Sequence, residues 1–238
     1  MNKIFQYECR RLMSSRFFAG LLLVVLVYGW QVLTEVTILG AAHTAPFSPW
    51  SFGDYISRML PLLWAGTQLF LTAFLSPKAR RTEALTDVLQ DSCILYALVR
   101  QSAVLAGTAV LALAVFGEGL VFYGLYFHWY EWRTLLSPFF LVLMPGLVFG
   151  LGSGWFLGQL KSWLVYGWMF MPFLWRILPL PDAFGLLSGT FFSQYPLTLE
   201  KLDPEFTVPG VNLLVQAGLL AGGAVFSLQG KNRRRNQK

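Results

Sequence analysis

Residues 134–160 read TLLSPFFLVLMPGLVFGLGSGWFLGQL, a run without a single charged side chain. An α-helix rises about 1.5 Å per residue, so roughly 20 apolar residues cross a hydrocarbon core about 30 Å thick. This run therefore predicts a membrane-spanning helix. Comparable apolar stretches lead to six predicted spans, at residues 17–39, 56–77, 98–127, 134–160, 162–181 and 208–230. Since a bilayer interior offers no water to unpaired backbone groups, we expect an all-α, multi-pass membrane protein.

The basic residues predict how these spans are oriented. With a cytoplasmic N-terminus and six alternating spans, fourteen of the eighteen Lys and Arg residues lie on the cytoplasmic side. The outer side, or its half of the membrane, keeps Arg58, Arg133, Arg176 and Lys201. The positive-inside rule favours this arrangement over its mirror image. We therefore expect both termini in the cytoplasm and the protein in the cell membrane.

The composition fits a single membrane domain over residues 1–238. Hydrophobic residues make up 55% of the chain and charged residues 13%, whereas about 25% of an ordinary soluble domain is charged. The net charge of +6 is carried in short clusters beside the spans, so membrane lipids are a sufficient partner and no nucleic-acid binding is expected. Cys9 and Cys93 both fall on the cytoplasmic side, where thiols stay reduced.

A short amphipathic helix is expected before the first span, over residues 3–16. Its apolar positions follow i, i+4, i+7 and i+8 spacing, and they are Phe5, Cys9, Leu12 and Met13. A helix of this kind lies in the inner membrane interface. An unstructured basic flank is the alternative.

The predicted fourth span carries a glycine at every fourth position. The four residues are Gly146, Gly150, Gly154 and Gly158. This spacing places them on one helix face, where the backbone of a second helix can approach closely. We therefore expect this face to be a helix-packing surface. Gly218 and Gly222 repeat the spacing once in the sixth span.

The sequence gives little support for an enzyme. The two histidines, His43 and His128, fall in outer loops, and no His or Cys pair has metal-ligand spacing. A Gly-x4-Gly-Lys-Ser/Thr phosphate loop is also absent, so the chain is not expected to hydrolyse ATP by that route. The sequence therefore predicts no catalytic residue, metal site or cofactor in this chain.

Glu118 is the one acidic residue well inside a predicted span. A charge buried in a membrane helix costs about 2.5–3.5 kcal/mol on insertion scales unless it is paired, protonated or hydrated. One interpretation is a polar point in a translocation path or a proton site. The other is a charge near the outer interface, because Glu118 is close in sequence to the aromatic turn at Trp129.

The cytoplasmic run between the second and third spans is amphipathic. Residues 78–89 read KARRTEALTDVL, and a helix there sets apolar residues against charged ones. The apolar positions are Leu85, Val88 and Leu89, and the charged positions include Arg80, Arg81, Glu83 and Asp87. An ordinary basic loop is the alternative to such a helix.

This run resembles the cytoplasmic segment of ABC type-2 permeases, the six-span membrane subunits of ATP-driven exporters. In that family the segment reads basic-x-Thr-x-x-acidic-x-Leu-Leu, and a Gly-Lys/Arg pair opens the third span. The positions that fit are Arg80, Arg81, Thr82, Asp87, Leu89 and Arg100. The usual Pro-Val-Ser is Asp91-Ser92-Cys93 here, and the glycine is Val99. The interfacial helix, the six spans, a long outer segment after the fifth span and the chain length are also similar.

The resemblance implies that residues 80–89 form a coupling helix seated in a groove of a separate ATP-binding subunit. Two permeases, identical or paralogous, would open outward when ATP closes a pair of such ATPases. ATP and Mg²⁺ would then bind the partner ATPase and not this chain. The alternative function is a non-transport integral membrane protein, such as an assembly or sensory partner.

Overall fold

The computed structural model describes residues 2–42, 44–75, 93–178, 181–201 and 204–229. Five long helices are α2 (Arg16–Glu35), α3 (Pro49–Leu75), α5 (Cys93–Phe127), α6 (Arg133–Leu160) and α11 (Gly210–Gln229). Shorter elements are α1 (Asn2–Met13), η1 (Thr37–Leu39), α7 (Leu164–Met169), α8 (Met171–Ile177), η2 (Asp182–Phe184), α9 (Gly185–Ser188) and α10 (Thr190–Thr198). The described part of the chain contains no strand, so the fold is all-α, as predicted.

The five long helices are each long and apolar enough to cross a membrane. They correspond to the first, second, third, fourth and sixth predicted spans. Helix α3 starts at Pro49, seven residues before the predicted second span at residues 56–77. Pro49 suits the first helical position, and the Ser48 hydroxyl accepts a hydrogen bond from the Ser51 amide at 3.2 Å.

The predicted fifth span, residues 162–181, does not form one continuous helix. Helices α7 and α8 meet at Phe170, and Pro172 stands in the first turn of α8, where its missing N–H ends the regular ladder. Two hydrogen bonds donated by indole groups hold this broken segment against α3 and α6. Trp64 of α3 donates to the Trp168 carbonyl at 3.2 Å, and Trp168 donates to the Ser153 hydroxyl of α6 at 2.8 Å. Six spans therefore remain a prediction, with five supported by helix length.

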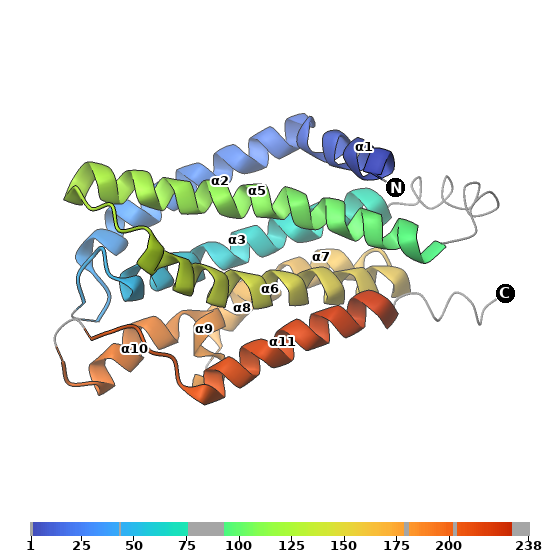
Figure 1. Cartoon of the computed structure of the whole chain (residues 1–238). Helices are drawn as coiled ribbons and strands as arrows, with labels where there is room; N and C mark the ends of the chain where they lie inside the picture. Colours follow the sequence, from blue (N-terminus) through green and yellow to red (C-terminus); the bar gives the residue numbers. More distant parts are fainter. Residues whose placement is uncertain (1, 43, 76–92, 179–180, 202–203, 230–238) are drawn as a thin grey trace.

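The helices run back and forth along one bundle (Figure 1). Helices α2 and α5 and the series α7–α10 lead away from the end where the chain begins, whereas α3, α6 and α11 lead back to it. The start of α1 and the end of α11 thus lie at the same end of the bundle, which we call the proximal end. The end near α10 is the distal end. In the predicted orientation, the proximal end is cytoplasmic.

Helix α3 forms the centre of the bundle and packs against α2, α5, α6 and α7. Its large side chains are fully buried, among them Trp50, Tyr55 and Trp64. The four glycines of α6 all face α3. A Cβ at Gly150 would lie 2.7 Å from the Trp64 ring, and those at the other three glycines would meet Leu60, Gln68 and Leu75. Because these four positions of α6 carry no side chain, the bulky residues of α3 have room to pack there.

Helix α1 is amphipathic and lies against the proximal end of the bundle. Leu12 is buried, and Phe5, Cys9 and Met13 pack against the core, as the predicted apolar face requires. The helix contacts α5 and α2. Glu8 is buried as well and pairs with exposed Arg11 at 3.4 Å.

Candidate functional site

Ionisable side chains lie inside the distal half of the bundle, at similar depth on three helices. They are Asp54 and Arg58 of α3, Glu118 of α5 and Arg176 of α8, and with Tyr55 we call them the polar layer. Arg58 and Glu118 each stand nine residues from the distal end of their helix, about 14 Å at 1.5 Å per residue. This depth lies within a hydrocarbon core about 30 Å thick.

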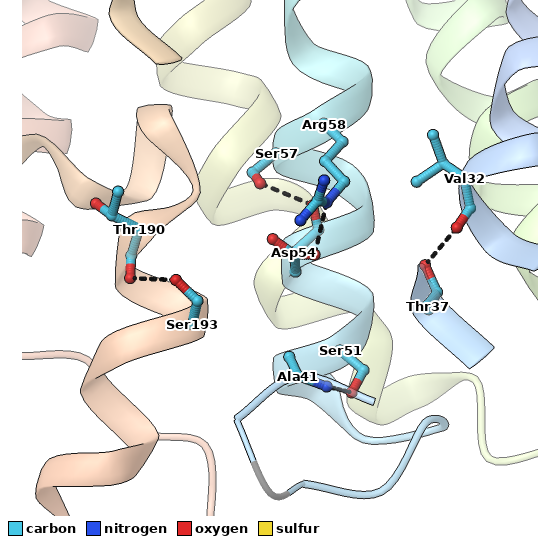
Figure 2. A network of polar contacts seen from close by, with 9 residues as sticks. All are labelled: Val32, Thr37, Ala41, Ser51, Asp54, Ser57, Arg58, Thr190 and Ser193. Atoms are coloured by element: carbon cyan, nitrogen blue, oxygen red, sulfur yellow. Dashed lines mark hydrogen bonds and ion pairs between the residues drawn. The ribbon is translucent and has the colours of Figure 1, made fainter. Parts of the chain in front are cut away.

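One side of the polar layer is an ion pair on α3. The Arg58 Nε donates to Asp54 Oδ2 at 2.7 Å, and the two residues are one helical turn apart (Figure 2). Asp54 is only 7% exposed, whereas Arg58 is partly exposed. Arg176 of α8 interacts electrostatically with both residues of the pair. Charged residues far apart in the sequence, on α3 and α8, therefore influence one another.

The junction between α9 and α10 closes the distal side of this ion pair. Gly189 has φ +86°, a left-handed conformation that glycine adopts without strain. A Cβ at this position would lie 2.5 Å from the Ser57 hydroxyl and 3.6 Å from Asp54 Oδ1. Next to it, the Phe192 ring occupies the space that a side chain at Gly53 would need. The backbone at Gly189 thus lies close to Asp54 and helps to shield its carboxylate from solvent, in agreement with the low exposure of Asp54.

The other side of the polar layer joins α2, α3 and α5. The Tyr55 hydroxyl lies 3.3 Å from Glu118 Oε2 and 3.3 Å from the Val115 carbonyl, so it can donate to either. A Cβ at Gly29 of α2 would overlap Glu118 Oε2, which shows how closely the carboxylate approaches the α2 backbone. Glu118 is half-buried in this position.

Replacement of Tyr55 by phenylalanine should destabilise the bundle, because Glu118 then loses its hydroxyl donor. Interhelical hydrogen bonds in membrane proteins are worth about 0.6–2 kcal/mol, so a loss of about 1 kcal/mol is expected. Thermal unfolding in detergent measures it. Tyr7→Phe, at an exposed tyrosine of α1, serves as the control and should be neutral. Equal melting temperatures for both variants would show that the Tyr55–Glu118 contact contributes nothing to stability.

The polar layer is suited to binding a charged ligand or ion. In the described ranges no group of three or more His, Cys, Asp or Glu residues could hold a metal ion. Ionisable side chains inside membrane proteins commonly mark the path of a substrate or ion. What these residues offer is a set of ionisable side chains, two basic and two acidic, placed where water is scarce.

A pocket of about 420 Å³ lies at the proximal end, between α1, α2, α3 and α7. Its walls are mainly apolar and include Phe17, Leu69 and Tyr166, while Arg11 supplies a positive charge at its edge.

The structure describes some of the site residues that were predicted from the sequence and leaves others outside its range. Glu118 lies in the polar layer, and the glycines of α6 line its contact with α3. The coupling residues fall outside the described residues; they are Arg80, Arg81, Glu83, Leu85, Asp87, Val88 and Leu89. The ion pair at Asp54 and Arg58 was missed, although an Asp and an Arg four positions apart in an apolar helix were a visible signal.

Comparison with known proteins found no match to a family model, a curated sequence or a solved structure.

Proposed function

We propose that this protein is the membrane-spanning permease subunit of an ATP-driven exporter. The observation that carries the transport part of this proposal is the polar layer. Buried or half-buried ionisable residues lie at similar depth on α3 and α5, two helices of membrane-spanning length, and on the short helix α8. A protein that only needed a stable anchor would gain nothing from placing charges there, since each is costly unless compensated.

The dependence on ATP is proposed from the resemblance of residues 80–89 to a coupling helix. The described residues on both sides of that segment support a mechanical link. The Arg11 and Arg100 guanidinium groups lie 6.0 and 5.8 Å from the centre of the Phe74 ring, in cation–π contact. Phe74 is near the end of α3 and Arg100 near the start of α5, so α1 contacts both helices next to the coupling segment.

In the proposed mechanism, a separate ATP-binding subunit binds residues 80–89 on the cytoplasmic side. ATP and Mg²⁺ bind that subunit, and closure of two ATPases moves the segment together with α1, α3 and α5. Two permease copies, or this chain and a paralogue, then alternate between inward-open and outward-open states in the cell membrane. The energy of ATP binding reaches the substrate path through these rigid contacts.

The runner-up is a non-transport membrane protein, such as an assembly or sensory partner. Purification of the tagged chain from its native membrane distinguishes the two proposals. The exporter proposal expects an ATP-binding subunit to co-purify, and its gene to lie near the gene for this chain. Repeated isolation of the chain with other partners only would favour the runner-up.

The proposed orientation places α10 outside the cell. Thr198 is exposed at the end of α10, so the Thr198→Cys variant should react with a membrane-impermeant maleimide on intact cells. Cys93 should react only after the cells are opened. Burial and the carboxylate of Glu8 raise the pKa of the Cys9 thiol, so less thiolate forms and Cys9 should label slowly, faster as the pH rises. External labelling of Cys93 would overturn the orientation.

A further inference from the structure

Another pocket, of about 490 Å³, lies at the distal end of the bundle, and we call it the distal pocket. It is lined by the loop before α3, the turn between α5 and α6, the start of α6 and the segment before α11, which come together at this end (Figure 1). Its lining residues lie in loops and in the first two turns of helices. In the predicted orientation, the distal pocket therefore opens toward the outer solution.

Three aromatic side chains line the distal pocket, and they are Phe47, Trp129 and Phe206. The ring centres of Phe47 and Trp129 are 6.1 Å apart, and Trp129 packs against Tyr123 at 5.8 Å. Phe206 packs against Trp50 at 4.9 Å. Because Tyr123 and Trp50 are fully buried, the walls of the pocket are anchored in the core. The faces of aromatic rings carry partial negative charge and attract organic cations.

Two carboxylates join these rings in the lining of the distal pocket. Glu131 and Glu205 are both exposed, and neither side chain makes a hydrogen bond or ion pair within the described part of the chain. Among the described lining residues none is basic. Arg133 is close to Glu131 in sequence but lies over the Trp132 ring, 5.8 Å from its centre. The lining thus favours a ligand that has a positive charge and an apolar surface.

We propose that the distal pocket binds the alkylammonium group of a soluble organic cation. The alkyl groups of such a cation pack against the rings of Phe47, Trp129 and Phe206, and its charge interacts with their π-systems. Glu131 and Glu205 supply the counter-charge. A phospholipid headgroup suits this pocket less well, because its phosphate would meet two carboxylates and no basic lining residue. Binding of the cation does not depend on the exporter proposal.

The binding test titrates choline into the purified full-length chain in an uncharged detergent and a phosphate buffer, with saturation-transfer NMR as the readout. The uncharged carbon analogue of choline, in which a tert-butyl group replaces the trimethylammonium group, has the same shape without the charge. Phosphocholine adds the phosphate of a lipid headgroup. Choline should bind about tenfold or more tightly than either, because it alone is a net cation.

Variants of the lining residues make the test specific. The double variant Glu131→Gln/Glu205→Gln removes both charges with little change in shape and should bind choline about fivefold more weakly. Trp129→Leu should also weaken binding about fivefold, and Trp129→Phe should retain more of it. The matched controls are Glu200→Gln and Tyr130→Leu. Both alter exposed residues outside the pocket lining and should leave the affinity for choline unchanged.

Three results would overturn this inference. Equal affinity for choline and its uncharged analogue would show that the pocket is merely apolar. Equal affinity of the wild type and the double glutamine variant for choline, with normal elution and melting temperature, would remove the carboxylates from the site. Tighter binding of phosphocholine than of choline would show a lipid-headgroup site. Because neither ATPase nor ATP is present, each result leaves the exporter proposal to its own test.

Discussion

Replacement of Gly152 by leucine is expected to prevent α6 and α11 from packing together and to abolish most of the folded yield. A Cβ at Gly152 would overlap the carbonyl oxygen of Gly223 and lie 2.8 Å from its carbonyl carbon. From the other helix, a Cβ at Gly223 would lie 2.6 Å from the Val148 carbonyl oxygen and 2.8 Å from the Phe149 Cα. All these neighbours are backbone atoms, so no rotamer change can relieve the clash.

Overpacking of a well-packed core costs about 1–3 kcal/mol even where side chains can adjust, and a cost above this range is expected for Gly152→Leu. Folded yield by size-exclusion chromatography and thermal unfolding in detergent measure it. Gly218→Leu is the matched control on α11, because nothing lies within 4 Å of a Cβ there. Normal stability of Gly152→Leu would contradict the close crossing of α6 and α11.

The same measurement on the α6 face that packs against α3 should give a smaller loss. Leucine at Gly150 would displace the Trp64 ring, which is fully buried and donates a hydrogen bond to the Trp168 carbonyl. A side chain can move where a backbone cannot, so Gly150→Leu should destabilise less than Gly152→Leu. The Gly154→Leu variant should behave in the same way, because its neighbour is the Gln68 side chain. Wild-type stability of both variants would show that this face does not pack tightly.

The sequence predicted which segments are helical and apolar, because these properties depend on local composition. The packing partner of each glycine depends on tertiary geometry and was not available from spacing alone. The repeat in the sixth span pointed to Gly218 and Gly222, yet nothing lies within 4 Å of a Cβ at Gly218, and Gly223 makes the backbone contact with α6. The face of a helix can be predicted from periodicity, but its neighbour cannot.

The fifth span and the polar layer show two other limits of prediction from sequence. The apolar composition of residues 162–181 did not reveal the break in the helix at Phe170. The break is tolerated because Trp64 donates a hydrogen bond to the carbonyl of Trp168. Arg176 was expected near the end of the fifth span, but its electrostatic interaction with Asp54 and Arg58 depends on how α8 packs. A charge within a span is visible in sequence, whereas its partner on another helix is not.

Reversal of Glu83 and Asp87 to lysine is expected to weaken or abolish binding of the partner ATPase while leaving the spans folded. In the proposed coupling helix, these carboxylates orient the contact, and the apolar positions Leu85, Val88 and Leu89 supply its buried part. Two reversed charges at one interface should lower the affinity about tenfold or more. The matched control reverses Glu200 and Asp203, which the proposed topology places on the outer side.

Co-purification of the cognate ATP-binding subunit with the wild type and these two variants, followed by its hydrolysis rate and substrate transport in the reconstituted complex, tests the central claim most directly. We expect the wild type and the Glu200/Asp203 variant to retain the ATPase and to couple hydrolysis to export. The Glu83/Asp87 variant should lose association or coupling, with a normal elution profile and melting temperature. Full association and coupled transport in that variant would show that residues 80–89 are not the coupling helix. Absence of any ATP-binding subunit from the wild-type preparation would contradict the exporter proposal itself.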